Sequence, residues 1–169
     1  DPDSGKPVLF SITSGNTGNG FALDPNTGLL TISNPNCVCF EGNPVYNLAV
    51  KATDNEGFSS EAMLTVDVTD INENPLCLTQ YFTVEENTPV QTIVGTVIAS
   101  EPDFNQTLTY NIVSGNQNNA FSINSNDGLL KVNNSLELNF EENPEYKLTI
   151  SVQDNGEGNL TTFATIIIS

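Results

Sequence analysis

The chain of 169 residues contains no histidine and no tryptophan, and only 4 basic residues stand against 21 acidic ones. The absence of histidine excludes a Ser-His or Cys-His nucleophilic pair, an imidazole base and a histidine metal site. Four positive charges cannot neutralise a run of phosphates, which makes nucleic acid and anionic membranes poor partners. The formal net charge of -17 instead favours cations as ligands, because cations relieve the mutual repulsion of the carboxylates.

Long hydrophobic runs and abundant cysteine are also missing. The longest apolar block, at residues 163–168, has the length of a strand and is too short to span a membrane. The 3 cysteines are too few for a disulfide scaffold, and their spacing matches no zinc motif. No signal peptide opens the chain, and we expect it to be part of a longer protein.

An internal repeat is the clearest positive feature. Residues 1–69 align without a gap with residues 101–169, and 22 of these 69 pairs are identical. The shared segments include Ile-x-Ser-Gly-Asn, which begins at residues 12 and 112. They also include Phe-Glu-x-Asn-Pro-x-Tyr-x-Leu, which begins at residues 40 and 140. Two copies of one module are therefore present.

Each copy is predicted to consist of β-strands. Apolar and polar residues alternate over 46–52 and 146–152, as in a strand with one buried face, and the gapless register matches a later strand at 64–68 with 164–168. Further short strands are expected at 93–99, 108–113, 121–123 and 129–132. Turn-forming clusters separate the strands, and no segment shows a sustained helical period. The predicted fold class is all-β, with an antiparallel sandwich of about seven strands per module.

The first copy is incomplete. Residues 75–100 of the second copy carry two strands that have no counterpart ahead of residue 1. A sandwich that lacks two strands exposes part of its core and its strand edges. Two explanations remain open: the chain has been cut from a longer one, or a neighbouring copy supplies the strands.

Oxygen-bearing residues are concentrated at the junction of the copies, in Asp70-Ile-Asn-Glu-Asn-Pro75. This segment resembles the linker of tandem cadherin repeats, which reads Asp-x-Asn-Asp-Asn-x-Pro. Other motifs that resemble those of the family follow in order, at residues 1–3, 38–41, 52–54, 84–89, 101–103, 138–141 and 152–154. The resemblance covers essentially the whole chain. It implies two tandem Greek-key β-sandwiches of immunoglobulin-like, cadherin type: a partial repeat at 1–69, a calcium-binding linker at 70–75 and a complete repeat at 76–169.

The resemblance also implies calcium ligands, because Ca²⁺ takes roughly six to eight oxygens that one linker and two module ends can supply. The expected ligands of the inter-module site, for two or three ions, are Glu41, Asp70, the Ile71 carbonyl, Asn72, Glu73, the Asn74 carbonyl, Glu101, Asp103 and Asp154. Asp1, Asp3 and Asp54 would serve a preceding linker, and Glu86, Asn139 and Glu141 a following one. Taken alone, such residues are also common in turns and on solvated acidic faces.

Cysteines and sequons add two expectations. Cys39 stands where the family has an aspartate, and a thiol is a poor ligand for a hard cation, so we expect the outermost ion to be weak or absent. A disulfide from Cys77 to Cys37 or Cys39 would tether the modules near that position, whereas buried free thiols are the alternative. N-glycosylation sequons occur at Asn105, Asn133 and Asn159.

The function that the resemblance implies is mechanical. We expect an extracellular segment of a membrane-anchored cell-adhesion protein, in which calcium stiffens a rod of repeats. The alternative is a structural repeat of an extracellular fibre or matrix protein, with strands donated between copies. Members that exchange N-terminal strands do so through a tryptophan, which this chain lacks, so an adhesive tip is not expected.

The expected partners are other cadherin-like repeats, of the same chain or of neighbouring copies. Nucleic acid and small-molecule substrates are not expected. Paired carboxylates can cleave glycosides, but here they fall at turns and module junctions. Glu85 and Glu86 are adjacent in a predicted strand and face opposite sides. We therefore expect no enzymatic activity.

Overall fold

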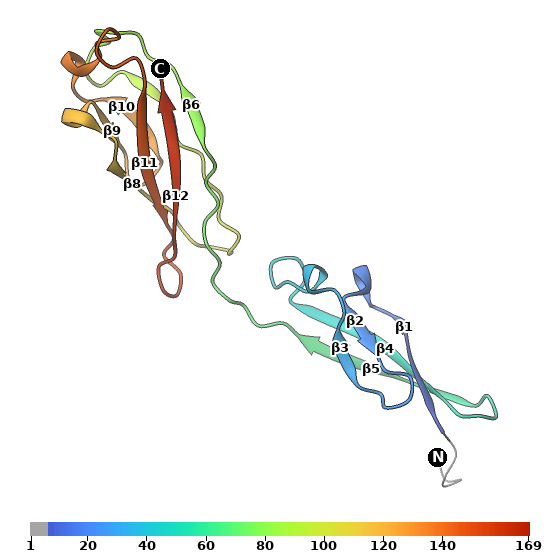
Figure 1. Cartoon of the computed structure of the whole chain (residues 1–169). Helices are drawn as coiled ribbons and strands as arrows, with labels where there is room; N and C mark the ends of the chain where they lie inside the picture. Colours follow the sequence, from blue (N-terminus) through green and yellow to red (C-terminus); the bar gives the residue numbers. More distant parts are fainter. Residues whose placement is uncertain (1–6) are drawn as a thin grey trace. The chain divides into compact units, whose positions relative to one another are not determined.

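The computed structural model describes residues 7–169, which form two compact units: the first ends at Ile71 and the second is Asn72–Ser169. Asp1 and Asp3, expected to serve a preceding linker, lie outside the described residues. Both units are built from β-strands and short 3-10 helices (Figure 1). Within the described part of the chain, no helix has the length and apolarity needed to cross a lipid bilayer.

The first unit has two small sheets. Its elements are β1 Leu9–Ser14, η1 Thr17–Asn19, β2 Phe21–Leu23, β3 Leu30–Ile32, η2 Pro35–Cys37, β4 Val45–Thr53 and β5 Ser59–Asp67. One sheet has the order β1-β4-β5 and the other is the β2-β3 hairpin, and all of these strand pairs are antiparallel. The alternation predicted for 46–52 is therefore confirmed as the central strand of the larger sheet.

The second unit has seven strands, as predicted for the complete module. Its elements are β6 Gln80–Phe82, β7 Ile93–Thr96, β8 Thr109–Ser114, η3 Gln117–Asn119, β9 Phe121–Ile123, β10 Leu129–Val132, η4 Ser135–Glu137, β11 Tyr146–Gln153 and β12 Thr161–Ile168. They form the sheets β6-β12-β11-β8 and β7-β10-β9, in which β6 runs parallel to β12. The described part of the first unit contains no counterpart of β6 or β7, which confirms that it lacks the two N-terminal strands.

The final strands of the two copies do not follow the expected gapless register. Leu48 pairs with Leu64 in the first unit, whereas Leu148 pairs with Ile166 in the second. The prediction that matched 64–68 with 164–168 is therefore wrong, because the hairpin loop of the second unit is two residues longer. Side chains alternate with a period of two along a strand, so this shift leaves the same face towards the core.

The shared Ser-Gly-Asn segment makes a structural joint in both units. Gly115 has a φ of 81°, and a Cβ there would lie 1.9 Å from the carbonyl oxygen of Lys147. The next residue, Asn116, accepts a hydrogen bond from the Phe121 amide at 2.9 Å and donates to its carbonyl at 2.8 Å. The ring of Phe121 then packs edge-on against Tyr146, with centroids 5.1 Å apart. The equivalent residues of the first unit make the same contacts, which explains why both copies retain this motif.

The two units bury different amounts of apolar surface. In the second unit a continuous core fills the space between the two sheets. In the described part of the first unit, the buried hydrophobic side chains are Phe21, Tyr46 and Leu48. The core is thus complete in one copy and partial in the other.

All three cysteines are free in the structure. Cys77 is 7% exposed and belongs to the core of the second unit, where its Sγ lies 3.5 Å from the carbonyl oxygen of Ile98. Burial raises the pKa of this thiol, which keeps it protonated at neutral pH. The expected disulfide from Cys77 to Cys37 or Cys39 is therefore not formed, because the Cys77 side chain faces the core of its own unit.

Candidate metal centre

Three loops of the second unit meet at one end of its sandwich. They comprise residues 72–75, residues 101–107 before β8, and residues 154–160 between β11 and β12. The strand register brings them together, because the last residue of β11 pairs with the first residues of both β8 and β12. A bridge between Leu76 and Ser100 joins the first two loops. These loops carry five residues that were expected to act through their side chains: Asn72, Glu73, Glu101, Asp103 and Asp154.

Asp154 holds the hairpin loop and the linker together. Its Oδ1 accepts hydrogen bonds from the backbone amides of Gly156 at 3.1 Å and Leu160 at 2.9 Å. Its Oδ2 accepts a hydrogen bond from Nδ2 of Asn72 at 3.1 Å. Hydrogen bonds to an ionised carboxylate are stronger than those between neutral groups, so this buried charge fixes Asn72 against the second unit.

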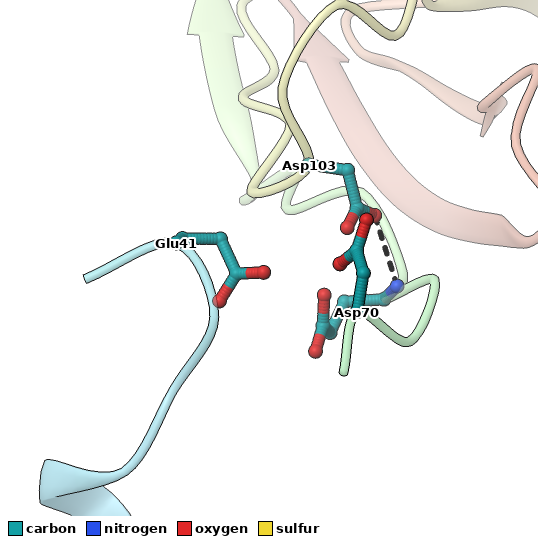
Figure 2. Close-up of side chains that lie close together, drawn as sticks. Glu41, Asp70 and Asp103 are labelled. Carbon is teal, nitrogen blue, oxygen red and sulfur yellow. Dashed lines mark hydrogen bonds between the residues drawn. The ribbon is translucent and has the colours of Figure 1, made fainter. Parts of the chain in front are cut away.

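Asp103 and Glu101 each have one buried oxygen without a hydrogen-bond partner. Asp103 is 5% exposed, and its Oδ2 accepts a hydrogen bond from the Glu73 amide at 3.0 Å (Figure 2), while its Oδ1 has no partner. Oε1 of Glu101 accepts from the Asp103 amide at 3.1 Å, while Oε2 is buried without a partner. A buried polar group left unpaired costs about 1–3 kcal/mol, and more if it is charged. These two oxygens therefore fit a bound cation, which would supply the missing partner.

The charges of this centre disfavour one another. Burial raises the pKa of the Glu101 carboxyl, and the negative charges of Asp103 and Asp154 raise it further, although the hydrogen bond from the Asp103 amide opposes the change. Carboxylates this close resist ionising together. A divalent cation would favour the ionised form of Glu101, and the oxygens of all three carboxylates are the donors that Ca²⁺ prefers.

The first unit presents an acidic pair of its own, Glu41 and Asp70, both labelled in Figure 2. Their carboxylates offer oxygens that lie within 4.8 Å of each other. In the second unit, Glu73 and Asp103 likewise offer carboxylate oxygens within 4.8 Å of each other. In addition, Oε1 of Glu41 is buried without a hydrogen-bond partner. Two like charges held this close favour the binding of a cation, so each unit carries part of a suitable donor set.

Three other expected ligands differ from these pairs. In the first unit, Asp54 sits in the hairpin loop, where its Oδ1 accepts hydrogen bonds from the amides of Glu56 at 2.8 Å and Phe58 at 2.9 Å. Ile71 and Asn74 are exposed and were expected to act only through their carbonyl oxygens. Asp54 therefore shapes a turn in the first unit.

The residues expected to serve a following linker lie in a separate part of the second unit. Glu86 and Asn139 line one pocket together with Ser169. Oδ1 of Asn139 accepts a hydrogen bond from the Glu141 amide at 3.1 Å. The structure thus brings this acidic group together, apart from the loops that hold Asp103.

Two residues in the centre escaped the sequence motifs. Gln106 donates from Nε2 to Oδ1 of Asn72 at 2.5 Å, and its own Oε1 is buried without a partner. At Gly156 a Cβ would lie 2.0 Å from Oδ1 of Asn72, so a larger residue would displace that side chain. In the alignment of the two copies, Gln106 corresponds to Lys6 and Gly156 to Glu56. This difference between the copies is a sequence signal that could have drawn attention to both positions.

The three sequon asparagines, Asn105, Asn133 and Asn159, are all exposed. Nδ2 of Asn133 donates to the carbonyl oxygen of Asn119 at 2.9 Å, a bond that a glycan would have to replace. Glycosylation at these positions stays a prediction. Exposure of the asparagine is the first requirement for it.

Comparison with known proteins places these features in a family. The model of the cadherin domain matches residues 1–69 and 80–169. Human cadherin-23 is 39% identical over 166 residues, an alignment that covers 93% of this chain and 5% of that protein. Mouse protocadherin Fat 4 is 36% identical over 172 residues, with 98% of this chain and 3% of that protein covered. The chain therefore spans a small part of these relatives.

Solved structures agree with the fold. A crystal structure of mouse cadherin-23 EC22-24 has a TM-score of 0.66 and 25% identity, and the match covers 96% of this chain and 52% of that one. The crystal structure of the human desmocollin-1 ectodomain has a TM-score of 0.60 and 24% identity, covering 100% of this chain and 34% of that one. The second likeness concerns the fold alone.

Proposed function

Because the chain belongs to the cadherin family, we propose that it is a calcium-binding pair of extracellular repeats in a cell-adhesion protein. The proposed arrangement is a partial repeat at 1–69, a linker at 70–75 and a complete repeat at 76–169. The structural division after Ile71 falls inside this linker. Two or three calcium ions would stiffen the linker, and the partners would be other cadherin-like repeats.

The observation that carries this proposal is the buried Oδ1 of Asp103, which has no hydrogen-bond partner. Burying a charged oxygen without a donor is unfavourable, whereas coordination to a cation satisfies it. The neighbouring donors are oxygens as well, from Glu101, Asn72 and Asp154. A hard cation such as Ca²⁺ suits this donor set better than a metal that prefers nitrogen or sulfur.

Both units would hold the ions. The first would supply Glu41, Asp70 and the carbonyl of Ile71, and the second Asn72, Glu73, the carbonyl of Asn74, Glu101, Asp103 and Asp154. The calcium would supply positive charge that these carboxylates lack, since the whole chain has 4 basic residues. Without it, repulsion among the acidic groups disfavours their approach, and the linker gains freedom.

Calcium titration of the full chain tests the site. Asp103→Asn removes one charge while keeping the size of the side chain, and we expect it to weaken calcium binding about a hundredfold, because ligand charge sets affinity. Glu145→Gln is the matched control, since Glu145 pairs with Lys147 at 3.0 Å outside the centre. Isothermal titration calorimetry of the three proteins should show a large loss for the first variant alone. Equal affinities would contradict the assigned ligands.

Small-angle scattering tests the mechanical consequence. We expect the wild-type chain to give a narrower distribution of interatomic distances with calcium than with a chelator, because the ions would restrict the linker. The Asp103→Asn variant should resemble the chelated wild type at moderate calcium concentration. Superimposable scattering curves with and without calcium would refute the stiffening mechanism.

The open side of the first unit favours a second candidate function, a structural repeat of an extracellular fibre. A groove there is lined by apolar side chains that include Leu30, Val38 and Val66. It lies beside edges of β3 and β5 that pair with no other strand within residues 7–169. A strand donated by a neighbouring copy would pair with such an edge and fill the groove. Sedimentation of the full chain should then show assembly that increases with concentration. A monomer at every concentration would eliminate this candidate.

A further inference from the structure

The side-chain amide of Gln106 lies among the oxygen donors of the second unit without a role in the expected ligand set. Its Nε2 donates to Oδ1 of Asn72 at 2.5 Å. Its Oε1 is shielded from solvent and has no hydrogen-bond partner. An amide that is satisfied at nitrogen and unsatisfied at a buried oxygen lacks a positively polarised neighbour on its oxygen side.

Asn72 cannot fill this gap, because its amide hydrogens are already used. Its Nδ2 donates to Oδ2 of Asp154 at 3.1 Å and to the carbonyl oxygen of Glu157 at 2.9 Å. These two bonds fix the Asn72 side chain, so that Oδ1 is the atom turned towards Gln106. The region between these side chains is therefore rich in acceptors, and the Asn72 amide has no further hydrogen to offer it.

Gly156 closes one side of this region. A Cβ at that position would lie 2.0 Å from Oδ1 of Asn72 and 2.4 Å from Oε1 of Gln106. The amide oxygens of Asn72 and Gln106 thus both lie close to the Cα of Gly156, on the side where another residue would carry its Cβ. A side chain at this position would have to displace the amides of Asn72 and Gln106.

We propose that Gln106 is a further calcium ligand, whose Oε1 joins the oxygens of Asn72, Asp103 and Asp154. This inference rests on the proposed calcium function. The buried Oδ1 of Asp103, 5% exposed and unpartnered, points independently to a cation at the same loops. Neutral amide oxygens are regular ligands of Ca²⁺, so Gln106 would raise the number of donors without adding charge.

Two substitutions separate a ligand from a residue that only positions Asn72. Gln106→Leu removes both amide atoms, and we expect calcium affinity to fall about tenfold, as for the loss of one oxygen ligand. Gln106→Glu keeps an oxygen and removes the N–H donor, and we expect it to bind calcium at least as tightly as the wild type. Gln117→Leu, at an exposed glutamine of the same unit, is the matched control and should leave affinity unchanged.

Calorimetric titration with calcium supplies the affinities, and thermal unfolding with and without calcium supplies a second readout. In the absence of calcium, Gln106→Glu should be less stable than the wild type, because its oxygens face Oδ1 of Asn72 without a donor. Added calcium should then raise its melting temperature more than that of the wild type. The Gln106→Leu variant should show a smaller calcium-dependent rise than the wild type.

The outcomes distinguish this inference from the proposed function. If the wild type binds calcium and Gln106→Glu is as weak as Gln106→Leu, the N–H of Gln106 matters and the ligand assignment is overturned. If the wild type binds calcium and Gln106→Leu has unchanged affinity, the assignment is likewise overturned while the proposed function stands. If the wild type takes up no calcium, both fall.

Discussion

The two units are copies of one module that differ in how far their cores are covered. At equivalent positions of the last strand, Leu64 is 40% exposed and Ile166 is fully buried. At the end of the short hairpin, Ile32 is 59% exposed and Val132 is fully buried. The chemistry of these residues is nearly the same, so the difference comes from their surroundings.

Two strands account for the contrast. In the second unit β6 pairs with β12 and β7 pairs with β10, and both strands cover the core. In the first unit the corresponding edges of β5 and β3 are without a partner strand among the described residues. The sheet β1-β4-β5 nevertheless forms without these two covering strands. The sheet therefore depends on its own residues, whereas full burial depends on the covering strands.

Hydrogen exchange on the full chain with calcium gives the largest expected contrast. We expect amides of β5 to exchange about a thousandfold faster than those of β12, because the first unit buries less apolar surface and opens at lower free energy. Mass spectrometry of peptides from both strands measures this ratio. Similar protection would show that another chain covers the first unit in solution, and dilution would then separate them.

A matched pair of cavity substitutions should sharpen the same comparison. Leu130→Ala, at a fully buried position, should lower the free energy of unfolding of the second unit by about 3 kcal/mol, through lost burial and a residual cavity. Leu30→Ala, at the half-buried counterpart, should cost the first unit about 1 kcal/mol, since water already reaches the site. Denaturant unfolding of each variant measures both values. Equal losses would mean that the groove is closed in solution.

The two hairpin aspartates should differ in calcium binding. Asp154→Asn should weaken binding about thirtyfold, because Asp154 is buried beside Asn72 and its charge adds to the donor set. Asp54→Asn should leave affinity unchanged, since Asp54 caps a turn of the first unit. Titration calorimetry compares the two variants. A loss of affinity in Asp54→Asn would show that the first hairpin loop also binds calcium.

The smallest contrast concerns the turn between β2 and β3 and its counterpart between β9 and β10. Hydrogen bonds from Thr27 and Asn26 hold the pKa of the Asp24 carboxyl below its ordinary value of 3.8. The stabilisation they give is therefore present above that value and is lost as the pH falls through the lowered pKa. The second unit has Asn124 at this position, whose Oδ1 accepts from the Asn126 amide at any pH. NMR titration should show a lowered pKa for the Asp24 carboxyl, whereas its counterpart Asn124 has no group that titrates.

Much of the architecture could be predicted from the sequence because it depends on local patterns. The alternation over 146–152 predicted β11, and 121–123 and 129–132 are the strands β9 and β10. The prediction of the last strand's register was wrong, because the alternation of apolar and polar residues does not show the length of a loop. The length of the loop at 154–160 decides the register of the last strand, and the gapless alignment missed its two additional residues. The disulfide failed for a similar reason, because spacing does not show that Cys77 faces a core.

Sequence patterns alone identify an acidic repeat of two all-β modules, the first of which is short of two strands. Composition, periodicity and repetition are properties of the sequence, and they can be read without knowing which residues are in contact. The fold is needed to show which buried oxygens of the second unit lack hydrogen-bond partners. It also brings Gln106 beside Asn72, although 34 positions separate them in the sequence. Burial and hydrogen-bond satisfaction depend on segments remote in sequence, so the charge of -17 predicts a cation and the fold decides which side chains can hold it.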